Sequence, residues 1–274
     1  MEKLKLKVEN WLTFYYNIFM KIGRFQLKGK KKIFWGIVEG ERVYEADSLK
    51  RKKIRKKSLP LGKLRILHPA NPTKIILVGL NYKDHAQELK MRIPEEPLIF
   101  MKPPSSLVGH QDYIRFSRRW GRIDYEAELA IVIKKEGKNI PPQKAKEYVL
   151  GYTCLNDVTA RDLQKKDGQW TRAKSFDTFC PLGPFIETQI KEPNNLKIEL
   201  FLNNELRQSS STSNFIFKVE EIVSFISSIM RLYPLDVIST GTPPGVGSLK
   251  DGDKVEIEIE KIGRLLNYVK EIKT

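Results

Sequence analysis

The chain has 274 residues, of which 41% are hydrophobic, 10% aromatic and 30% charged. A chain of this length and apolar content can bury one large core, or one core with a small satellite domain, which excludes an intrinsically disordered protein. The formal net charge of +16 would suit a nucleic-acid or membrane-surface partner, so the location of the charge matters more than its total.

The first twenty residues contain an apolar run, 11–20, that is about half the length needed to span a bilayer. Thr13 and Asn17 interrupt it, and no small-residue cleavage site follows, so we predict neither a signal peptide nor a membrane anchor. Met20 is directly followed by strand-like alternation. We therefore hypothesise that residues 1–19 are an extension upstream of the natural start, which the intact mass of protein from its native host would test.

Residues 20–68 are predicted to form a small β-rich N-terminal domain. Apolar and polar residues alternate in short runs from 21 to 46, and Glu39-Gly40-Glu41 is typical of a turn between strands. The segments 50–57 and 59–62 resemble a linker before a larger domain that covers 69–274.

The excess positive charge lies at this end of the chain. Residues 1–66 hold 19 Lys and Arg against 6 Asp and Glu, whereas the other 208 residues hold 30 against 27. The segment 50–57 supplies much of the excess, and we favour a solvated loop or strand face for it. A basic nucleic-acid-binding protein remains the alternative from another class, although no zinc-finger spacing, RNP-like motif or helix-turn-helix accompanies the charge.

The larger domain is predicted to be mainly β, of mixed α+β class. Short apolar or alternating runs predict its strands, and apolar residues at helical spacing predict one clear helix over 219–232. Because strands and helices do not alternate regularly, a doubly wound parallel sheet is not expected. The predicted strands cover residues 74–78, 124–134, 148–155, 236–239 and 255–259.

Only two cysteines occur, Cys154 and Cys180. They are too few for a disulfide framework and too far apart for a CxxC metal or redox motif. A reducing, cytoplasmic compartment is expected.

Three carboxylates form a candidate metal site. Glu126 and Glu128 lie two apart on a predicted strand, so their side chains share one face, and Asp157 follows the end of another apolar strand. Hard divalent cations such as Mg²⁺, Mn²⁺ or Ca²⁺ prefer oxygen ligands of this kind. An exposed acidic strand face is the alternative for the two glutamates alone; a third carboxylate favours the metal.

Cationic and acid–base residues could complete such a site. Three carboxylates around one divalent cation leave a negative charge, so Lys174 and Arg161 are candidates for holding an anionic substrate. His85 and Glu88 lie three apart on a predicted helical turn, where the carboxylate can orient the imidazole to activate a water. A surface pair is the alternative. His68 and His110 have no comparable neighbours, and we predict no chemical role for them.

Residues 241–247 read Gly-Thr-Pro-Pro-Gly-Val-Gly, which superficially resembles a phosphate-binding loop. Two prolines remove backbone donors and no Lys-Ser/Thr follows, so we reject a nucleotide site. A rigid turn is expected instead, with the Thr242 hydroxyl and nearby amides available to a carboxylate.

Five motifs, taken in order, resemble the fumarylacetoacetate hydrolase family over about residues 70–270. The first carries Asn81 and Tyr82, with His85 and Glu88 behind them. The others are Asp124-Tyr125-Glu126-Ala127-Glu128-Leu129, Asn156-Asp157-Val158-Thr159-Ala160-Arg161-Asp162, Lys174-Ser175-Phe176-Asp177-Thr178-Phe179-Cys180-Pro181-Leu182-Gly183-Pro184 and Ile238-Ser239-Thr240-Gly241-Thr242-Pro243-Pro244-Gly245-Val246-Gly247.

This resemblance implies a β-roll catalytic domain, a homodimer, and Mg²⁺ or Mn²⁺ held at Glu126, Glu128 and Asp157. It also implies that His85 and Glu88 belong to a lid over the substrate and that Lys174 polarises or holds substrate oxygens. Asn81, Tyr82, Arg161 and Thr242 are assigned to substrate binding.

The reaction expected from this site is metal-dependent hydrolysis of a C–C bond in a small anionic 2,4-dioxo acid of the acylpyruvate type. Family members that share such motifs differ in reaction, so three alternatives stay open. They are isomerisation of a 2-hydroxyhepta-2,4-diene-1,7-dioate, oxaloacetate decarboxylation and sugar-acid dehydration. The presence of His85 and Glu88 favours hydrolysis.

Overall fold

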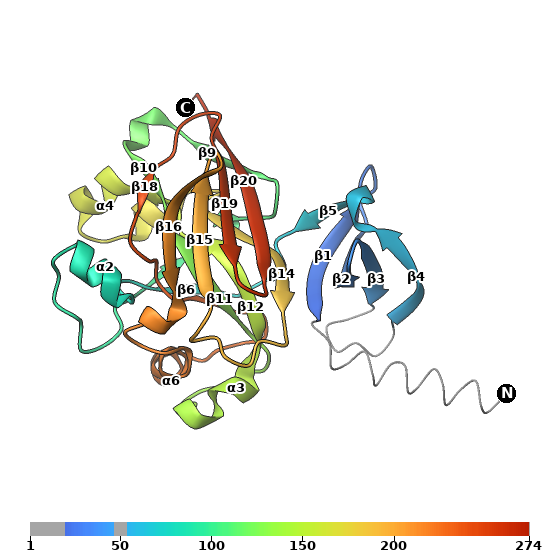
Figure 1. The fold of residues 1–274 in the computed structure, drawn as a ribbon, viewed down its shortest axis with the longest axis horizontal. Helices are drawn as coiled ribbons and strands as arrows, with labels where there is room; N and C mark the ends of the chain where they lie inside the picture. Colours follow the sequence, from blue (N-terminus) through green and yellow to red (C-terminus); the bar gives the residue numbers. More distant parts are fainter. Residues whose placement is uncertain (1–19, 47–53, 274) are drawn as a thin grey trace.

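A computed structural model describes residues 20–46 and 54–273, which form a large lobe and a smaller one beside it (Figure 1). The hypothesised extension, 1–19, and residues 50–53 of the basic segment lie outside the described residues.

The small lobe is an antiparallel β structure, as its alternating sequence predicts. Its strands pack around the buried aromatic rings of Phe25 and Phe34, and Phe185 from the large lobe joins this core. The strands are β1 (Lys21–Leu27), β2 (Ile33–Glu39), β3 (Arg42–Ala46), β4 (Ile54–Pro60) and β5 (Leu64–Leu67).

The prediction that 50–57 and 59–62 form a linker is wrong for the described part. Residues from Ile54 onward form β4, which pairs with β3 in the register Val43↔Leu59. Leu59 and Leu61 pack against the buried cluster of the small lobe, and this apolar contact holds the segment in the sheet. Of the two structures favoured for the basic segment, a solvated loop or a strand, its described part forms a strand.

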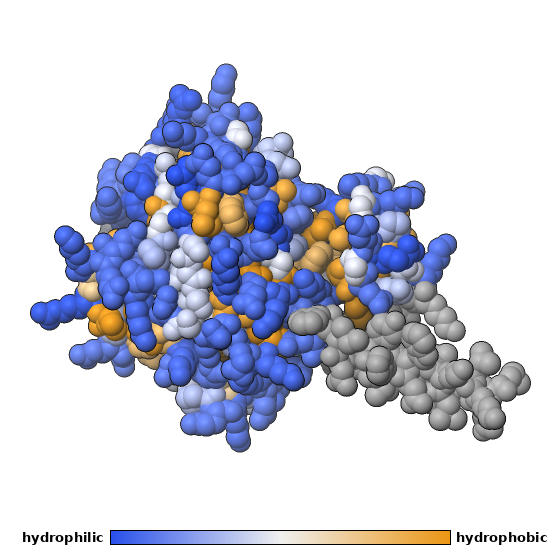
Figure 2. Space-filling view, viewed as in Figure 1, coloured by the Kyte–Doolittle hydropathy of each residue, from blue (hydrophilic) through white to orange (hydrophobic). Residues whose placement is uncertain are grey.

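The two lobes share one sheet. Strand β1 pairs with β14 (Cys180–Glu187) in the register Ile22↔Ile186, so the small lobe's strands continue into a sheet of 12 strands. Figure 2 shows hydrophobic side chains gathered along the junction of the lobes on an otherwise mainly hydrophilic face. The small lobe is therefore attached by both backbone pairing and apolar packing.

The large lobe is mainly β, which confirms the predicted fold class. Its part of the 12-stranded sheet is mostly antiparallel, and a second sheet has the order β16-β15-β19-β20-β9. The strands of the first are β6 (Ile75–Val78), β7 (Ile99–Lys102), β8 (Leu107–Val108), β11 (Ala127–Ile133), β12 (Val149–Asn156), β14 and β17 (Val237–Ser239). Those of the second are β9 (Tyr113–Phe116), β15 (Lys197–Leu202), β16 (Glu205–Ser211), β19 (Lys254–Ile259) and β20 (Gly263–Glu271).

Short helices flank these sheets. The predicted long helix is α6 (Val219–Ile229), which ends three residues before the predicted boundary. Its buried side chains recur at helical spacing and join the main core, which explains why the periodicity was informative. The other helices are α2 (Lys83–Glu88), α3 (Ala145–Tyr148), α4 (Arg161–Asp167) and α5 (Thr171–Lys174). Within the described ranges, no helix has the length and apolar character needed to cross a membrane.

The strand predicted over 124–134 is broken at Glu126. Strand β10 (Ile123–Tyr125) lies in a small sheet with β13 (Thr159–Ala160) and β18 (Gly247–Ser248), and β11 starts at Ala127 in the large sheet. The chain changes sheets at Glu126, whose N–H binds the side chain of Asn156 at 3.0 Å. The break places Glu126 between the end of β10 and the start of β11, next to the end of β12.

Candidate metal centre

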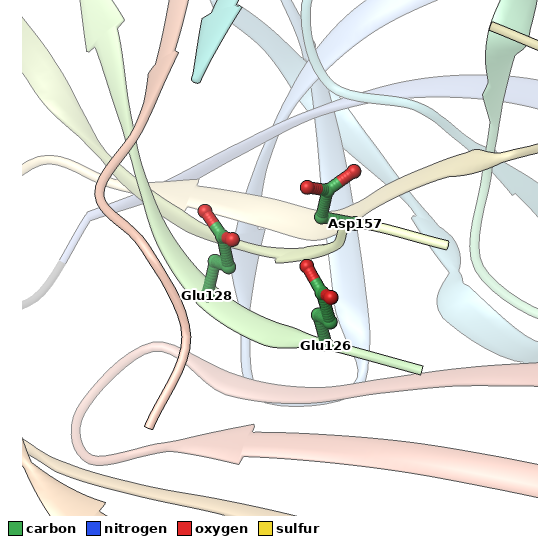
Figure 3. A group of neighbouring side chains, drawn as sticks. All are labelled: Glu126, Glu128 and Asp157. Carbon is green, nitrogen blue, oxygen red and sulfur yellow. The ribbon is translucent and has the colours of Figure 1, made fainter. Parts of the chain in front are cut away.

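Three carboxylates converge in the interior of the large lobe. Glu126, Glu128 and Asp157 each offer an oxygen within 4.8 Å of the others. Their carboxylates are turned toward one shared space (Figure 3). The residues are 6%, 1% and 0% exposed, so the fold has brought three acidic groups together away from water. The predicted ligand set is therefore assembled in space.

Backbone hydrogen bonds fix this arrangement. Asp157 donates its N–H to the carbonyl of Glu126 at 2.8 Å, which ties the end of β12 to the break between β10 and β11. The Thr159 hydroxyl donates to the carbonyl of Asp157 at 2.8 Å. The two segments that carry the ligands thus hold each other in place before any ligand arrives.

Two cations compensate part of the negative charge. The buried ammonium of Lys174 donates to Glu126 Oε2 at 2.9 Å and also to Asp157 Oδ2. Arg161 donates to the other oxygen of Glu126 and to Asp124 Oδ2, the latter at 2.8 Å. Burial alone would raise the pKa of Glu126, but the two cations outweigh it and hold that pKa at about 2. Lys174 and Arg161 therefore lie where the sequence analysis placed cationic help.

Glu128 is the least compensated of the three carboxylates. Its Oε2 accepts from the Ser239 hydroxyl and, at 2.9 Å, from the Gly241 N–H. Among the described residues, no Lys or Arg forms an ion pair with it. Burial, followed by repulsion from Asp157, raises its pKa well above the ordinary value for a glutamate.

A divalent cation fits this donor set. Asp157 Oδ1 is buried and accepts no hydrogen bond from any residue that the structure describes, so its lone pairs remain free. The buried Glu128 carboxylate has no ion-pair partner among the described residues, and no hydrogen bond takes up the lone pairs of Asp157 Oδ1, so a cation bound between them would interact with both. Oxygen-only ligands favour Mg²⁺, Mn²⁺ or Ca²⁺ over softer metals.

His85 and Glu88 form a pair on α2, as predicted. His85 Nδ1 and Glu88 Oε2 lie 2.8 Å apart, and Glu88 Oε1 accepts the Gly245 N–H at 3.1 Å. The turn that contains Gly245 also contains Gly241, which binds Glu128. One turn therefore links the His85–Glu88 pair to the carboxylate cluster.

Gly241 and Gly245 are required by this turn. Both have positive φ, +88° and +93°, which disfavours other residues. A Cβ on Gly241 would lie 2.8 Å from the carbonyl oxygen of Gly79, and one on Gly245 would lie 2.3 Å from that of Arg207.

The residues assigned to substrate binding are placed differently from one another. Thr242 is nearly buried and accepts a hydrogen bond from Gln208 Nε2 at 2.9 Å, so its own O–H remains available. The Tyr82 hydroxyl is buried and unpaired among the described residues. Asn81 is committed to the backbone instead: its amide donates to the carbonyls of Phe217 and Thr240, and its oxygen accepts the Phe217 N–H. The side-chain atoms of Asn81 that were expected to contact substrate therefore bind backbone groups and hold loops together.

The sequence analysis missed three residues that shape the site. Gln208 joins the Ala127 N–H to Thr242, Ser239 binds Glu128, and Lys102 lies behind Asp157. Ser239 was visible as the end of a predicted strand within one of the quoted motifs. Lys102 and Gln208 carried no signal, because both reach the site through contacts distant in sequence.

Comparison with known proteins defines the class. Residues 74–270 match the family described as fumarylacetoacetate (FAA) hydrolase, C-terminal. The chain belongs to the fumarylacetoacetate hydrolase family, which confirms the resemblance seen in its motifs.

Three similar proteins are named as a tautomerase, an isomerase and a hydrolase. The mitochondrial oxaloacetate tautomerase Fahd2a of Rattus norvegicus is 45% identical over 222 residues, which are 77% of this chain and 71% of that protein. The structure of a 5-carboxymethyl-2-hydroxymuconate delta-isomerase from Mycobacterium smegmatis superimposes with a TM-score of 0.85 at 40% identity, covering 93% of this chain and 100% of the other. That of a maleylpyruvate hydrolase from Sphingobium sp. SYK-6, in complex with manganese(II) and pyruvate, gives 0.78 at 28% identity, with 93% and 100% covered.

Proposed function

We propose that this protein is a divalent-metal-dependent hydrolase that cleaves a C–C bond in a small 2,4-dioxo acid of the acylpyruvate type. One observation carries the proposal: the turn that contains Gly241 and Gly245 binds both the carboxylate cluster and the His85–Glu88 pair. Gly241 binds the metal-ligand candidate Glu128, and Gly245 binds Glu88, the partner of His85. The proposed ligand cluster and the proposed acid–base pair are thereby joined through hydrogen bonds to one turn.

The donor set indicates what holds the metal and what it supplies. Glu126, Glu128 and Asp157 would hold Mg²⁺, with Mn²⁺ or Ca²⁺ as alternatives. The bound ion would act as a Lewis acid toward the oxygens of the 2-oxo acid. The manganese and pyruvate in the maleylpyruvate hydrolase structure support this choice of metal class and substrate head group.

The protein's own residues supply the other functions. The Nδ1 side of His85 faces Glu88, which leaves Nε2 to take a proton from water as its oxygen attacks the distal carbonyl carbon. The bond between that carbon and C3 then breaks, the proton goes to C3, and the products are a carboxylic acid and pyruvate. Lys174 is placed to balance negative charge on the substrate oxygens.

Three side chains are proposed to bind the substrate carboxylate. Thr242 and Tyr82 each retain an O–H that no described residue accepts, and Arg161 extends its guanidinium between Asp124 and Glu126. Asn81 takes part by holding the loops that carry these groups.

A second candidate is tautomerisation or isomerisation at the same site. The oxaloacetate tautomerase of Rattus norvegicus and the muconate delta-isomerase of Mycobacterium smegmatis favour it. Such a reaction moves a proton between carbon and oxygen and needs His85 as a proton carrier without an attacking water.

The decisive experiment is the loss of ultraviolet absorbance of acylpyruvates, hydroxy-dienedioates and enol oxaloacetate, with Mg²⁺ and then with EDTA. Chelator-sensitive loss of an acylpyruvate, with pyruvate released in equal amount, is the result expected. Turnover of the dienedioates or of enol oxaloacetate alone would replace the hydrolase with the isomerase or tautomerase.

We further propose that the protein is a cytoplasmic homodimer, as the family resemblance and the absence of a cysteine framework suggest. The Rattus norvegicus relative is mitochondrial, so the compartment needs its own test by fractionation of the native host. Light scattering would give the oligomeric state, and a monomer at micromolar concentration would contradict the dimer.

A further inference from the structure

Lys102 is a fully buried cation behind the carboxylate cluster. It is the last residue of β7 and is 1% exposed. Its Nζ donates to three backbone carbonyls, those of Val158 at 2.9 Å, Lys174 at 2.7 Å and Phe179 at 2.7 Å. An ammonium group has three N–H donors, so these bonds use all of them.

The same Nζ lies 2.8 Å from Asp157 Oδ1. The three carbonyls can use every N–H of the ammonium, and Asp157 Oδ1 has no hydrogen-bond partner among the described residues, so the contact between Lys102 and Asp157 is an ion pair. Lys102 thus compensates the charge of Asp157 without occupying the lone pairs that a metal needs.

Lys174 offers a contrast within the same site. Its Nζ donates directly to Glu126 Oε2 and Asp157 Oδ2 and so occupies carboxylate oxygens. Lys102 instead holds the backbone on which the other groups stand. Val158 follows Asp157 in the chain, and the segment from Lys174 to Phe179 carries the second ammonium.

We propose that Lys102 is the positioning residue of this metal centre: it holds Asp157 and the 174–179 segment so that Asp157 Oδ1 stays free and correctly placed for a divalent cation. The inference rests on the metal-binding half of the proposed function. It assigns Lys102 no contact with substrate.

Two explanations of Lys102 predict opposite changes in Mn²⁺ affinity when the lysine is removed. If Lys102 acts only as a counter-charge, its removal leaves the cluster more negative and Mn²⁺ binds equally well or more tightly. If it acts by positioning, three carbonyls lose their donor and the ligand moves, so Mn²⁺ binds more weakly. Loss of an outer partner of a metal ligand costs about 10–100-fold in affinity.

The test is the dissociation constant for Mn²⁺, measured on purified protein by the electron paramagnetic resonance of the free ion, with no substrate present. Lys102→Met should weaken binding by about 10–100-fold. Lys102→Gln, which retains two N–H donors but no charge, should weaken it less. An unchanged or tighter constant in Lys102→Met would overturn the proposal.

Lys74→Met is the matched control. Lys74 pairs with the buried Asp236, and its side chain is only 14% exposed, but neither residue belongs to the carboxylate cluster. This variant should lose thermal stability while its Mn²⁺ constant stays within about twofold of wild type. Equal weakening in both lysine variants would mean that general loosening of the fold, not Lys102, controls the affinity.

Two further results distinguish failure of this inference from failure of the metal-binding proposal. If Lys102→Met does not fold, Lys102→Gln decides, and a wild-type constant in that folded variant together with an unshifted melting temperature would reject the positioning role. If wild-type protein binds no Mn²⁺, the metal-binding proposal itself fails and this inference fails with it. Weak binding confined to the Lys102 variants supports both.

Discussion

The carboxylate cluster and the His85–Glu88 pair are held in different ways. Glu128 and Asp157 are at most 1% exposed, and backbone hydrogen bonds join the strands that carry the cluster. The pair lies on the six-residue helix α2, where the side chains of His85 and Glu88 are 12% and 43% exposed. One part of the site is thus built into the core, whereas the other lies on a short helix nearer the surface.

This difference between the carboxylate cluster and the His85–Glu88 pair indicates that they have different roles. The cluster stays assembled because moving any carboxylate would disrupt a buried network of charges. The His85–Glu88 hydrogen bond is a single exposed contact worth about 0.5–1.5 kcal/mol, while Asp84 ties α2 to Ser210 and Asn214. The fold therefore surrounds the carboxylates with more buried contacts than it gives the proposed base.

The largest effect is expected from Glu128→Gln. The amide keeps the shape and can still accept from Ser239 and Gly241, but it removes one anionic ligand. Metal-dependent turnover should fall to background. In wild type, Mg²⁺ at 100 times its dissociation constant should stabilise the protein by about 2.7 kcal/mol, and EDTA should remove this gain.

The matched control is Glu136→Gln, because Glu136 is half exposed and pairs with Arg231 on the surface. Turnover and the Mg²⁺ effect should be unchanged there. Retention of the Mg²⁺ stabilisation in Glu128→Gln would show that the ion binds elsewhere.

His85→Ala should separate the two regions. Loss of a general base costs about 10²–10⁴-fold in rate, whereas the carboxylates proposed to hold the metal are untouched. Turnover should therefore fall by that factor while the Mn²⁺ constant, measured by calorimetry, stays near wild type. A parallel loss of metal affinity would place His85 among the ligands, and the carboxylates and the pair would then act as one unit.

The contrast also explains what the sequence could reveal. Strand periodicity predicted Glu126 and Glu128 on one face, and the end of an apolar run predicted the place of Asp157; the three do converge, although the strand is broken at Glu126. The helical spacing of His85 and Glu88 was equally local. The family motifs added the order of these pieces and their chemistry.

Contacts distant in sequence were not predictable. The break at Glu126 depends on the side chain of Asn156, and the segment 54–60 joins a sheet through pairing with β3. Lys102 follows an apolar strand, where a lysine usually marks the strand's solvated end, and only the folded chain buries it among three carbonyls. Asn81 was assigned to substrate binding from a family motif, and a motif does not show the backbone hydrogen bonds that its side chain forms.

Gly245→Ala should disturb the turn that joins the two regions. The added Cβ would lie 2.3 Å from the Arg207 carbonyl oxygen at a φ of +93°, so the turn must move and the bond to Glu88 is lost. We expect a stability loss of about 1–3 kcal/mol in urea unfolding, together with reduced turnover and a nearly unchanged Mn²⁺ constant. Gly40→Ala, at a positive φ in open space, controls for backbone strain alone and should leave turnover intact.

The smallest expected effect concerns pH. Two carboxylates of the cluster should change the free energy of unfolding with pH in opposite directions. In metal-free protein the ion pairs of Glu126, with its pKa held at about 2, contribute stability that is present above the unfolded value near 4.5 and lost as the pH falls. Glu128 acts in the opposite direction. Burial and Asp157 raise its pKa, so its contribution is greatest below the unfolded value and is lost as the pH rises through the raised one.

Glu128→Gln should therefore remove a falling limb from the stability curve above about pH 5 and leave the loss at low pH in place. One carboxyl group changes the slope by at most about 1.4 kcal/mol per pH unit. The measurement is urea unfolding of both proteins in EDTA between pH 4 and 8. Subtracting the two curves cancels the titrating groups that do not interact with Glu128, so the difference reports Glu128 together with its coupling to Asp157 and Glu126. A flat difference would mean that Glu128 is already compensated without metal, and the unequal charge compensation that motivates the metal site would then have to be abandoned.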